Sequence, residues 1–97
     1  MNLSSHQERE LIKLAKKGDK LAIEKLINAN YGFIYKCALK YSNYGIPTED
    51  LVSEGILALM QAIKKFDLRK KVKLLTFAAY YIENAMRKIT VEQSHSV

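Results

Sequence analysis

Residues 50–67 read DLVSEGILALMQAIKKFD, and the apolar pattern of this stretch decides the fold. Apolar side chains recur every three or four positions, which is the spacing of one face of an α-helix. The expected inner face comprises Leu51, Val52, Gly55, Ile56, Leu59, Ile63 and Phe66. Gly45 and Pro47 break the chain before this stretch, and Thr48 can cap a helix over residues 49–66. An apolar face of this width predicts burial among other helices.

Helical spacing continues upstream of this stretch, and no segment alternates polar and apolar residues with the period of a strand. Ser5 and Glu8 form a capping-box pattern for a first helix. Gly18 would end that helix by adopting a left-handed conformation. Asp19 is a suitable N-cap for a second helix. The N-terminal part of the chain therefore predicts two short helices in succession.

Further segments complete a helical bundle. Asn28 and Asn30 interrupt the apolar pattern and predict the end of the second helix. A third helix is expected over residues 33–41, and the polar residues 67–73 are expected to form a loop before the last helix. The sequence therefore predicts an all-α, compact bundle of about five helices, with residues 1–97 as a single domain.

The positive charge of the chain is concentrated towards its C-terminal end. The formal net charge is +6. Residues 64–97 hold 8 of the 16 Lys and Arg residues but 3 of the 10 Asp and Glu residues. Such a local excess attracts polyanions, including nucleic acid, through the release of counterions. A charged surface that keeps the protein soluble has the same composition, so both interpretations remain open on charge alone.

Composition argues against several classes of protein. Cys37 is the only cysteine, which rules out an internal disulfide, and with His6 and His95 far apart in sequence no zinc ligand set can be assembled. No apolar run is long enough to span a membrane, and the N-terminus lacks the pattern of a signal peptide. These features predict a cytoplasmic protein that has no membrane partner and no metal site.

Chemical catalysis has no support in the sequence. The glycines are scattered rather than grouped in a phosphate-binding loop, and no nucleophile, base and acid are brought together by spacing. Cys37 lies on an apolar helical face, where it is expected to behave as a small core residue. We therefore expect that the protein is not an enzyme and uses no cofactor.

The last helix combines aromatic and basic residues outside its apolar stripe. The stripe comprises Ala78, Ile82, Ala85, Met86 and Ile89. The residues outside it, or at its border, are Phe77, Tyr80, Tyr81, Asn84, Arg87 and Lys88, and Lys70, Lys71 and Lys73 precede them. Exposed rings beside cations form a platform for single-stranded nucleic acid, because bases stack on the rings while cations hold the phosphates. Alternatively, the aromatic residues pack beneath another helix.

The helix over residues 49–66 offers a second surface, away from its inner face. This surface comprises Asp50, Ser53, Glu54, Leu57, Met60 and Gln61. Leu57 and Met60 are apolar among polar neighbours, a pattern typical of a docking site for a partner protein. In a small bundle the same pattern also arises from a wide core stripe.

Two motifs give the chain a resemblance to a known family. The run DLVSEGILALMQAIKKFD, residues 50–67, resembles the core-binding motif of sigma factors of the sigma-70 type. The run LLTFAAYYIENAM, residues 74–86, resembles their promoter-melting helix. Upstream, KKGDKLAIEKLI and LINANYGFIYKCALKYSNYGIPTEDL are similar to the preceding helices of the same domain. The resemblance covers roughly residues 11–93 and implies the fold of sigma domain 2; the ending IENAM is closer to sporulation-type sigma factors.

The resemblance implies a function in transcription initiation. Sigma domain 2 docks on the clamp helices of the largest subunit of core RNA polymerase, and it recognises and melts the minus-ten promoter element. Bases of the non-template strand flip out and are held in pockets of the protein. An anti-sigma factor, or a separate partner subunit, is a further candidate partner. None of these steps is chemical catalysis.

The resemblance also implies roles for individual residues. The expected DNA contacts are Asn30, Arg69, Lys70, Lys73, Phe77, Tyr80, Tyr81, Asn84, Arg87 and Lys88. Phe77 takes the position of the aromatic that stacks on a flipped adenine, and Tyr80 and Tyr81 take those of the paired wedge aromatics. The expected polymerase contacts are Asp50, Ser53, Glu54, Leu57 and Met60. Asn84 stands where a polar group reads the upstream edge of the element.

The chain also departs from the family pattern. Val72 and Leu74 stand where aromatics are common, and Glu83 replaces a usual basic residue. Tyr80 and Tyr81 replace paired tryptophans, which reduces the stacking area. The chain stops before any helix-turn-helix, so it is expected to be either a fragment of a longer sigma factor or a short sigma-like protein. A sigma-like interaction module, which binds polymerase or another partner without reading promoter DNA, is therefore the alternative function.

Overall fold

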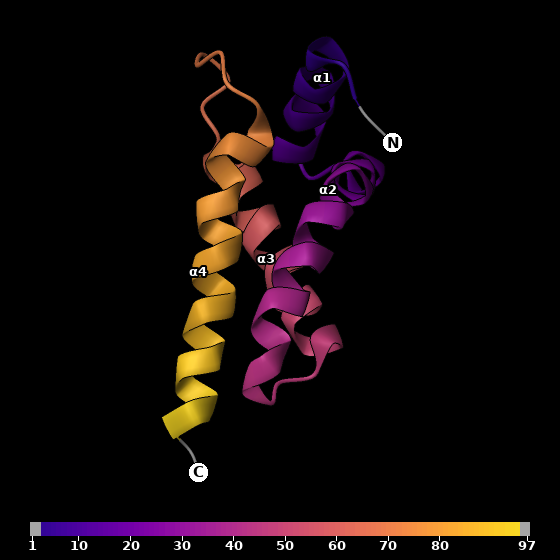
Figure 1. The fold of residues 1–97 in the computed structure, drawn as a ribbon. Helices are drawn as coiled ribbons and strands as arrows, with labels where there is room; N and C mark the ends of the chain where they lie inside the picture. The colour runs from indigo at the N-terminus through magenta and orange to yellow at the C-terminus, as the bar shows by residue number, and fades with distance from the viewer. Residues whose placement is uncertain (1–2, 96–97) are drawn as a thin grey trace.

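The fold is organised around α3 (Thr48–Lys65), which packs against both α2 (Lys20–Tyr41) and α4 (Leu74–His95). The computed structural model describes residues 3–95, with side chains as far as Glu92. α1 (Ser5–Lys16) packs against α2 and lies beside the α3–α4 loop, as Figure 1 shows. A short 3-10 helix, η1 (Ser42–Tyr44), joins α2 to α3. Within residues 3–95 every regular element is helical, which confirms the all-α prediction.

The number of α-helices differs from the prediction, because the expected second and third helices form the single helix α2. Asn30 does not end a helix. Its buried side-chain amide donates a hydrogen bond of 2.8 Å to the carbonyl oxygen of Leu26, four residues earlier. This bond satisfies the asparagine inside the helix instead of at its end. Residues 3–95 therefore contain four α-helices rather than about five.

The ends of α1 and the start of α2 agree with some of the predicted capping residues and differ from others. Gly18 has a φ of +90° after α1, and the side chain of Asp19 accepts from the backbone N–H of Ala22 at the start of α2, both as predicted. The predicted capping box is one residue too late, because Ser4 and Gln7 form it. The carboxylate of Glu8 instead accepts a hydrogen bond from α4.

The start of α3 also differs from the prediction. Thr48 is the first helical residue, and Pro47 occupies the N-cap position without any side-chain hydrogen bond. Proline fixes its own φ and has no N–H group, so it can precede a helix without leaving a donor unsatisfied. Gly45, with a φ of +87°, makes the left-handed turn that leads into this start. The break at Gly45 and Pro47 is thus confirmed, whereas the cap at Thr48 is wrong.

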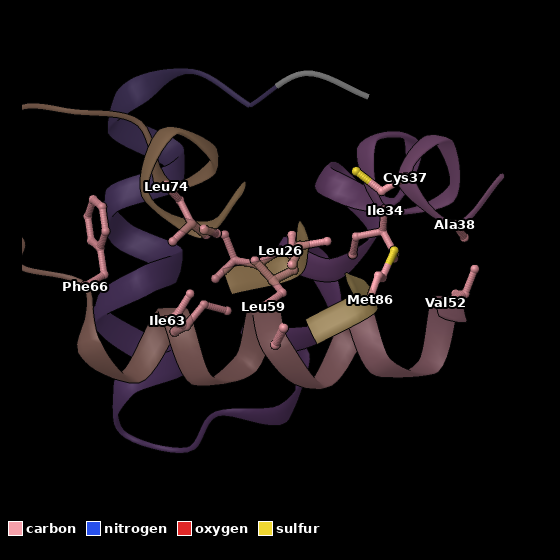
Figure 2. Packing of buried hydrophobic residues seen from close by; sticks show 14 of the residues in the cluster. Leu26, Ile34, Cys37, Ala38, Val52, Leu59, Ile63, Phe66, Leu74 and Met86 are labelled. Carbon is pink, nitrogen blue, oxygen red and sulfur yellow. The ribbon is translucent and has the colours of Figure 1, made fainter. Parts of the chain in front are cut away.

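The core forms where α2, α3 and α4 meet (Figure 2). The predicted inner face of α3 is buried except for Ile56, which is partly exposed. From α4, Ala78, Ile82 and Met86 are buried, whereas Ala85 and Ile89 are only partly buried. Cys37 is buried among these residues, which confirms its expected place in the core, and burial raises the pKa of its thiol.

Gly55 marks the closest approach of the three helices. A Cβ atom at this position would lie 2.8 Å from Cγ2 of Ile34 and 2.8 Å from Cε of Met86. The end of the methionine can move, but Cγ2 of Ile34 is attached to a branched carbon that has little rotational freedom. A side chain at position 55 would therefore push α2 away from α3.

We predict that Gly55→Ala destabilises the protein by about 1–3 kcal/mol, because the added methyl group overpacks the core. Gly32→Ala is the matched control, since a Cβ at Gly32 meets nothing within 4 Å. This control should gain about 0.5–1 kcal/mol from helix propensity. Unfolding of both variants in urea measures the difference. Equal stability of the two variants would contradict the close packing at Gly55.

Candidate nucleic-acid interface

A series of aromatic rings leads from the core to the surface of α4. Phe66 is buried, and its ring centroid lies 5.7 Å from that of Phe77 in an edge-on arrangement. The Phe77 ring lies 5.1 Å from that of Tyr81, and the Tyr81 ring lies 6.5 Å from that of Tyr80. Tyr80 is 70 % exposed. Pairs of this geometry are favourable beyond their buried area, so the exposed ring rests on a fixed base.

The four rings have different parts in this arrangement. Phe77 and Tyr81 are partly buried and contact other rings. They therefore contribute to the aromatic surface of α4 and also pack beneath it. Tyr80 projects from α4, where it can meet a ligand. The sequence left open whether the aromatic residues pack inside the bundle or form an exposed platform. In the structure Phe77 mainly packs against other rings, whereas Tyr80 is exposed.

Polar and basic groups lie on the same helix. Oδ1 of Asn84 accepts a hydrogen bond of 2.7 Å from the guanidinium of Arg87. Arg87 and Lys88 are exposed. A ligand at this surface would therefore meet Asn84 and Arg87 as a coupled pair, with the charge of Lys88 nearby.

An open groove between α3 and α4 connects the two predicted surfaces. From α3 it is lined by Glu54, Leu57, Ala58 and Gln61, and from α4 by Tyr80, Tyr81, Asn84, Ala85 and Lys88. The predicted polymerase-docking residues Glu54 and Leu57 thus lie beside predicted DNA contacts. A protein bound along the outer face of α3 would form one wall of any site at Tyr80.

The remaining predicted docking residues lie on the outer side of α3. Asp50 and Ser53 are exposed near its start, and Leu57 is 56 % exposed. Met60 is partly buried. An exposed leucine of this size among polar neighbours is a feature of contact surfaces, although single exposed apolar residues are common.

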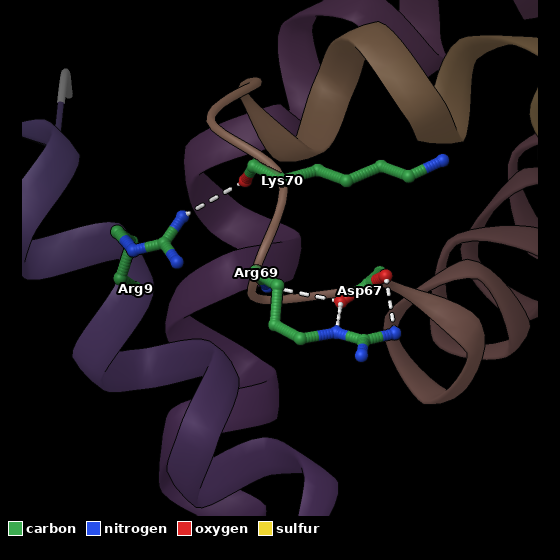
Figure 3. A network of polar contacts seen from close by, with 4 residues as sticks. All are labelled: Arg9, Asp67, Arg69 and Lys70. Carbon is green, nitrogen blue, oxygen red and sulfur yellow. Dashed lines mark hydrogen bonds and ion pairs between the residues drawn. The ribbon is translucent and has the colours of Figure 1, made fainter.

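The loop between α3 and α4 carries cations whose charges are partly engaged. Figure 3 shows that the guanidinium of Arg69 folds back onto Asp67. Nε of Arg69 lies 3.0 Å from Oδ1 of Asp67, and a second guanidinium nitrogen lies 3.1 Å from Oδ2. Lys70 and Lys73 are exposed in the same loop. Of these predicted contacts, Arg69 would have to leave its partner, or share it, in order to bind a phosphate.

The structure places Asn30 and Arg9 in surroundings that the sequence alone does not predict. Asn30 is buried within α2, where its side chain bonds to the carbonyl oxygen of Leu26. Arg9, which was not predicted, lies against the loop and donates a bond of 3.3 Å to the carbonyl oxygen of Lys70. A hollow at this point is lined by Ser5, Glu8, Arg9, Arg69, Lys71, Val72 and Lys73. No local spacing signals this cluster, because Arg9 is 61 residues from Lys70 in sequence.

Metal coordination is not indicated in the described part of the chain. Among its His, Cys, Asp and Glu residues no group of three or more is placed to hold a metal ion. None of its helices is long and apolar enough to cross a membrane. An ion pair of 3.1 Å between Lys40 and Glu83 joins α2 to α4 at the edge of the bundle.

Comparison with known proteins places these features in a family. Residues 26–91 match the family model described as Sigma-70 region 2. The chain is 38% identical over 90 residues to the RNA polymerase sigma-C factor of Myxococcus xanthus, covering 89% of this chain and 30% of that protein. It is 33% identical over 95 residues to the RNA polymerase sigma factor RpoS of Coxiella burnetii, covering 98% of this chain and 27% of that protein.

A third relative is similar in extent. The RNA polymerase sigma factor SigA of Clostridium acetobutylicum is 34% identical over 95 residues, covering 98% of this chain and 25% of that protein. The chain therefore spans between a quarter and a third of the length of these curated relatives.

We predict that Asp67 titrates well below the ordinary pKa of an aspartate side chain. The hydrogen bonds from Arg69 favour the charged carboxylate, which lowers the pKa of Asp67 from 3.8 to about 2. Any stability gained from this pair is present above pH 3.8 and is lost as the pH falls through about 2. The carboxyl ¹³C shift of Asp67, followed by NMR against pH, measures the midpoint. Arg69→Gln should return the pKa towards its ordinary value, and an ordinary midpoint in the unmodified protein would refute the pairing.

Proposed function

Because the chain belongs to the sigma-70 region 2 family, we propose that it acts in transcription initiation by binding core RNA polymerase and promoter DNA. In this proposal the outer face of α3 docks on the clamp helices of the largest polymerase subunit. The exposed face of α4 binds the non-template strand of the minus-ten element as the duplex opens. The protein works in the cytoplasm beside polymerase and catalyses no chemical step.

The observation that carries the DNA-binding part is the exposure of Tyr80 on a ring series anchored in the core. A ring that is 70 % exposed yet supported by Tyr81 presents a flat surface to a base at little cost in conformational entropy. Stacking of one base on such a ring contributes roughly 1–3 kcal/mol. The cations Arg87 and Lys88 lie on the same helix, where they can hold phosphates.

Melting in this scheme is a shift of an existing equilibrium. Flipping a base out of the duplex costs a few kcal/mol, so one stacking contact offsets most of that cost for one base. Contacts between the strand phosphates and the cations of the loop and of α4 add a salt-dependent contribution. Because only the opened strand exposes its base faces, the protein binds the open state more tightly and increases its population.

The docking part rests on the outer face of α3. Leu57 is exposed beside the acidic residues Asp50 and Glu54, an arrangement that suits a basic partner with an apolar contact. Leu57 and Tyr80 line the same groove, so polymerase docked at Leu57 would lie beside DNA bound at Tyr80 and would strengthen its binding. A docked helix would narrow the groove around the flipped base and exclude water from it.

The alternative function is a sigma-like interaction module that binds polymerase or another partner without reading DNA. The ion pair of Arg69 with Asp67 favours it, because this guanidinium is already engaged. An anti-sigma factor or a separate partner subunit would then be the relevant partner. The two functions share the docking surface on α3 and differ only in what the face of α4 does.

We predict that Tyr80→Ala weakens binding of a minus-ten non-template oligonucleotide by roughly fivefold to a hundredfold, the range expected for one lost stacking contact. Binding is measured by fluorescence anisotropy with core polymerase present. Tyr44→Ala is the matched control, because Tyr44 is also an exposed tyrosine, at 61 %, but lies in η1. Phe77 is unsuitable as the first target, since its ring packs on Phe66 and its loss would also affect folding. If Tyr80→Ala and Tyr44→Ala bind the strand equally well, the stacking role is wrong.

A salt titration and a docking variant separate the two functions. Strand binding should weaken as salt rises, with a slope of about 0.7 per phosphate contact for a single strand, and Lys88→Gln should reduce that slope. Leu57→Asp should abolish the association with polymerase in either function, because it places a charge in an apolar contact. Polymerase binding by the chain with no measurable strand binding at low salt would favour the interaction module.

A further inference from the structure

α4 begins without a capping side chain of its own. Its first residue is Leu74, and the preceding residue, Lys73, has no side-chain oxygen that could accept from the first N–H groups. The acceptor comes from another helix instead. Oε1 of Glu8 in α1 lies 2.9 Å from the backbone nitrogen of Leu74, at a partly buried position. Glu8 thus acts as a side-chain cap for α4 from 66 residues away, because it accepts from the first backbone N–H of the helix.

A second bond from α1 reaches the end of α3. Nζ of Lys16 donates a hydrogen bond of 2.9 Å to the carbonyl oxygen of Lys64, in the last turn of α3. Carbonyls in a last helical turn lack partners within the helix. The signs of the two charges match the helix dipoles, since the acid lies at the start of α4 and the base at the end of α3.

A third bond from α1 reaches Lys70, which lies between Lys64 and Leu74 in the sequence. The guanidinium of Arg9 donates to the carbonyl oxygen of Lys70 in the loop, as Figure 3 shows. Ile12, on the same face of α1, is fully buried and fixes the helix against the bundle. The spacing of Glu8, Arg9, Ile12 and Lys16 places them on one side of a helix. One face of α1 therefore forms hydrogen bonds with the end of α3, with the loop and with the start of α4.

We propose that Glu8 supplies from α1 the N-cap that α4 lacks, and that it thereby positions Phe77 and the ring series on α4. This inference rests on the proposed function only for its effect on DNA. Phe77 lies three residues after Leu74, within the first turn of α4. The direction of that turn decides whether the Phe77 ring reaches Phe66 on one side and Tyr81 on the other. Glu8 and Lys16 are positioning residues, because they act on the rings through the backbone of the helix ends.

The Glu8 bond is stronger than the other two. All three bonds involve a charged side chain, but only the Glu8 bond is partly buried, and without it the N–H of Leu74 would lose its acceptor at that site. The bonds from Arg9 and Lys16 are exposed to solvent. Loss of Glu8 should therefore loosen the first turn of α4, whereas loss of Lys16 alone should have a smaller effect.

Amide hydrogen exchange of the full chain tests the cap directly. We expect Glu8→Ala to accelerate exchange of the Leu74 amide by roughly tenfold or more, because its acceptor is removed. Glu8→Gln should restore most of the protection, since a neutral amide oxygen still accepts. Glu10→Ala is the matched control, because Glu10 lies on the same helix and forms its ion pair with the neighbouring Lys13. Amides in the middle of α3 should exchange alike in all four proteins.

Two further measurements separate positioning from general loss of stability. The ring-proton shifts of Phe77 should move in Glu8→Ala and return in Glu8→Gln, because they report the contacts with Phe66 and Tyr81. Affinity for the minus-ten strand should fall by about tenfold in Glu8→Ala and remain near the unmodified value in Glu8→Gln.

Unchanged Leu74 exchange or unchanged Phe77 shifts in Glu8→Ala would overturn the proposal, whatever happens to DNA binding. An equal loss of protection in Glu10→Ala would also overturn it, since the effect would then not come from the cap. Failure of the unmodified protein to bind the strand would instead refute the proposed function. In that case the exchange and ring-shift measurements would still decide whether Glu8 positions the rings.

Discussion

The close approach of α2 and α4 to α3 at Gly55 is the constraint on which the rest of the structure depends. With no Cβ at this point, Ile34 and Met86 can meet over the backbone of α3. This contact sets the distance and the direction of the flanking helices. Because α4 packs against Gly55 through Met86 and Ile82, Tyr80 and Arg87 lie outside this contact and are exposed. The exposed aromatic surface is thus a consequence of tight packing on the inner side of the same helix.

A second consequence concerns how firmly the exposed rings are held. Phe66 is buried at the end of α3 and contacts Phe77 near the start of α4, so the ring series crosses the loop between the two helices. Seven polar or weakly packed residues, 67–73, connect them, and such a loop has little stability of its own. The rings therefore depend on contacts at both helix ends, where the side chains of α1 lie. The surface of α4 is supported by core packing beneath it and by hydrogen bonds at its beginning.

Much of this could be predicted from the sequence, because the signals are local. Helical periodicity located the inner faces of α3 and α4, and Gly18 and Asp19 placed the junction of α1 and α2 correctly. Two of the errors share one cause. Asn30 and Glu8 were assigned by their usual local preferences, as a helix end and as part of a capping box. In the structure Asn30 is satisfied by Leu26 inside α2, and Glu8 by the backbone of Leu74. Where a polar group finds a distant or an internal partner, local preference loses its predictive value.

Charge composition alone describes the proposed nucleic-acid surface incompletely. The excess of cations in residues 64–97 left a polyanion-binding surface and a solubilising surface both open, and in the structure these cations have different partners. Arg69 is engaged by both oxygens of Asp67, so its net contribution to the local field is small at neutral pH. Arg87 is held against Asn84, which orients it without neutralising it. An oriented cation such as Arg87, near an exposed ring, favours one arrangement of base and phosphate over others. A cation whose charge is neutralised by a carboxylate, such as Arg69, favours none. Under the proposed function, selectivity of this face for an opened strand would follow from the placement of a few groups and not from the net charge of +6.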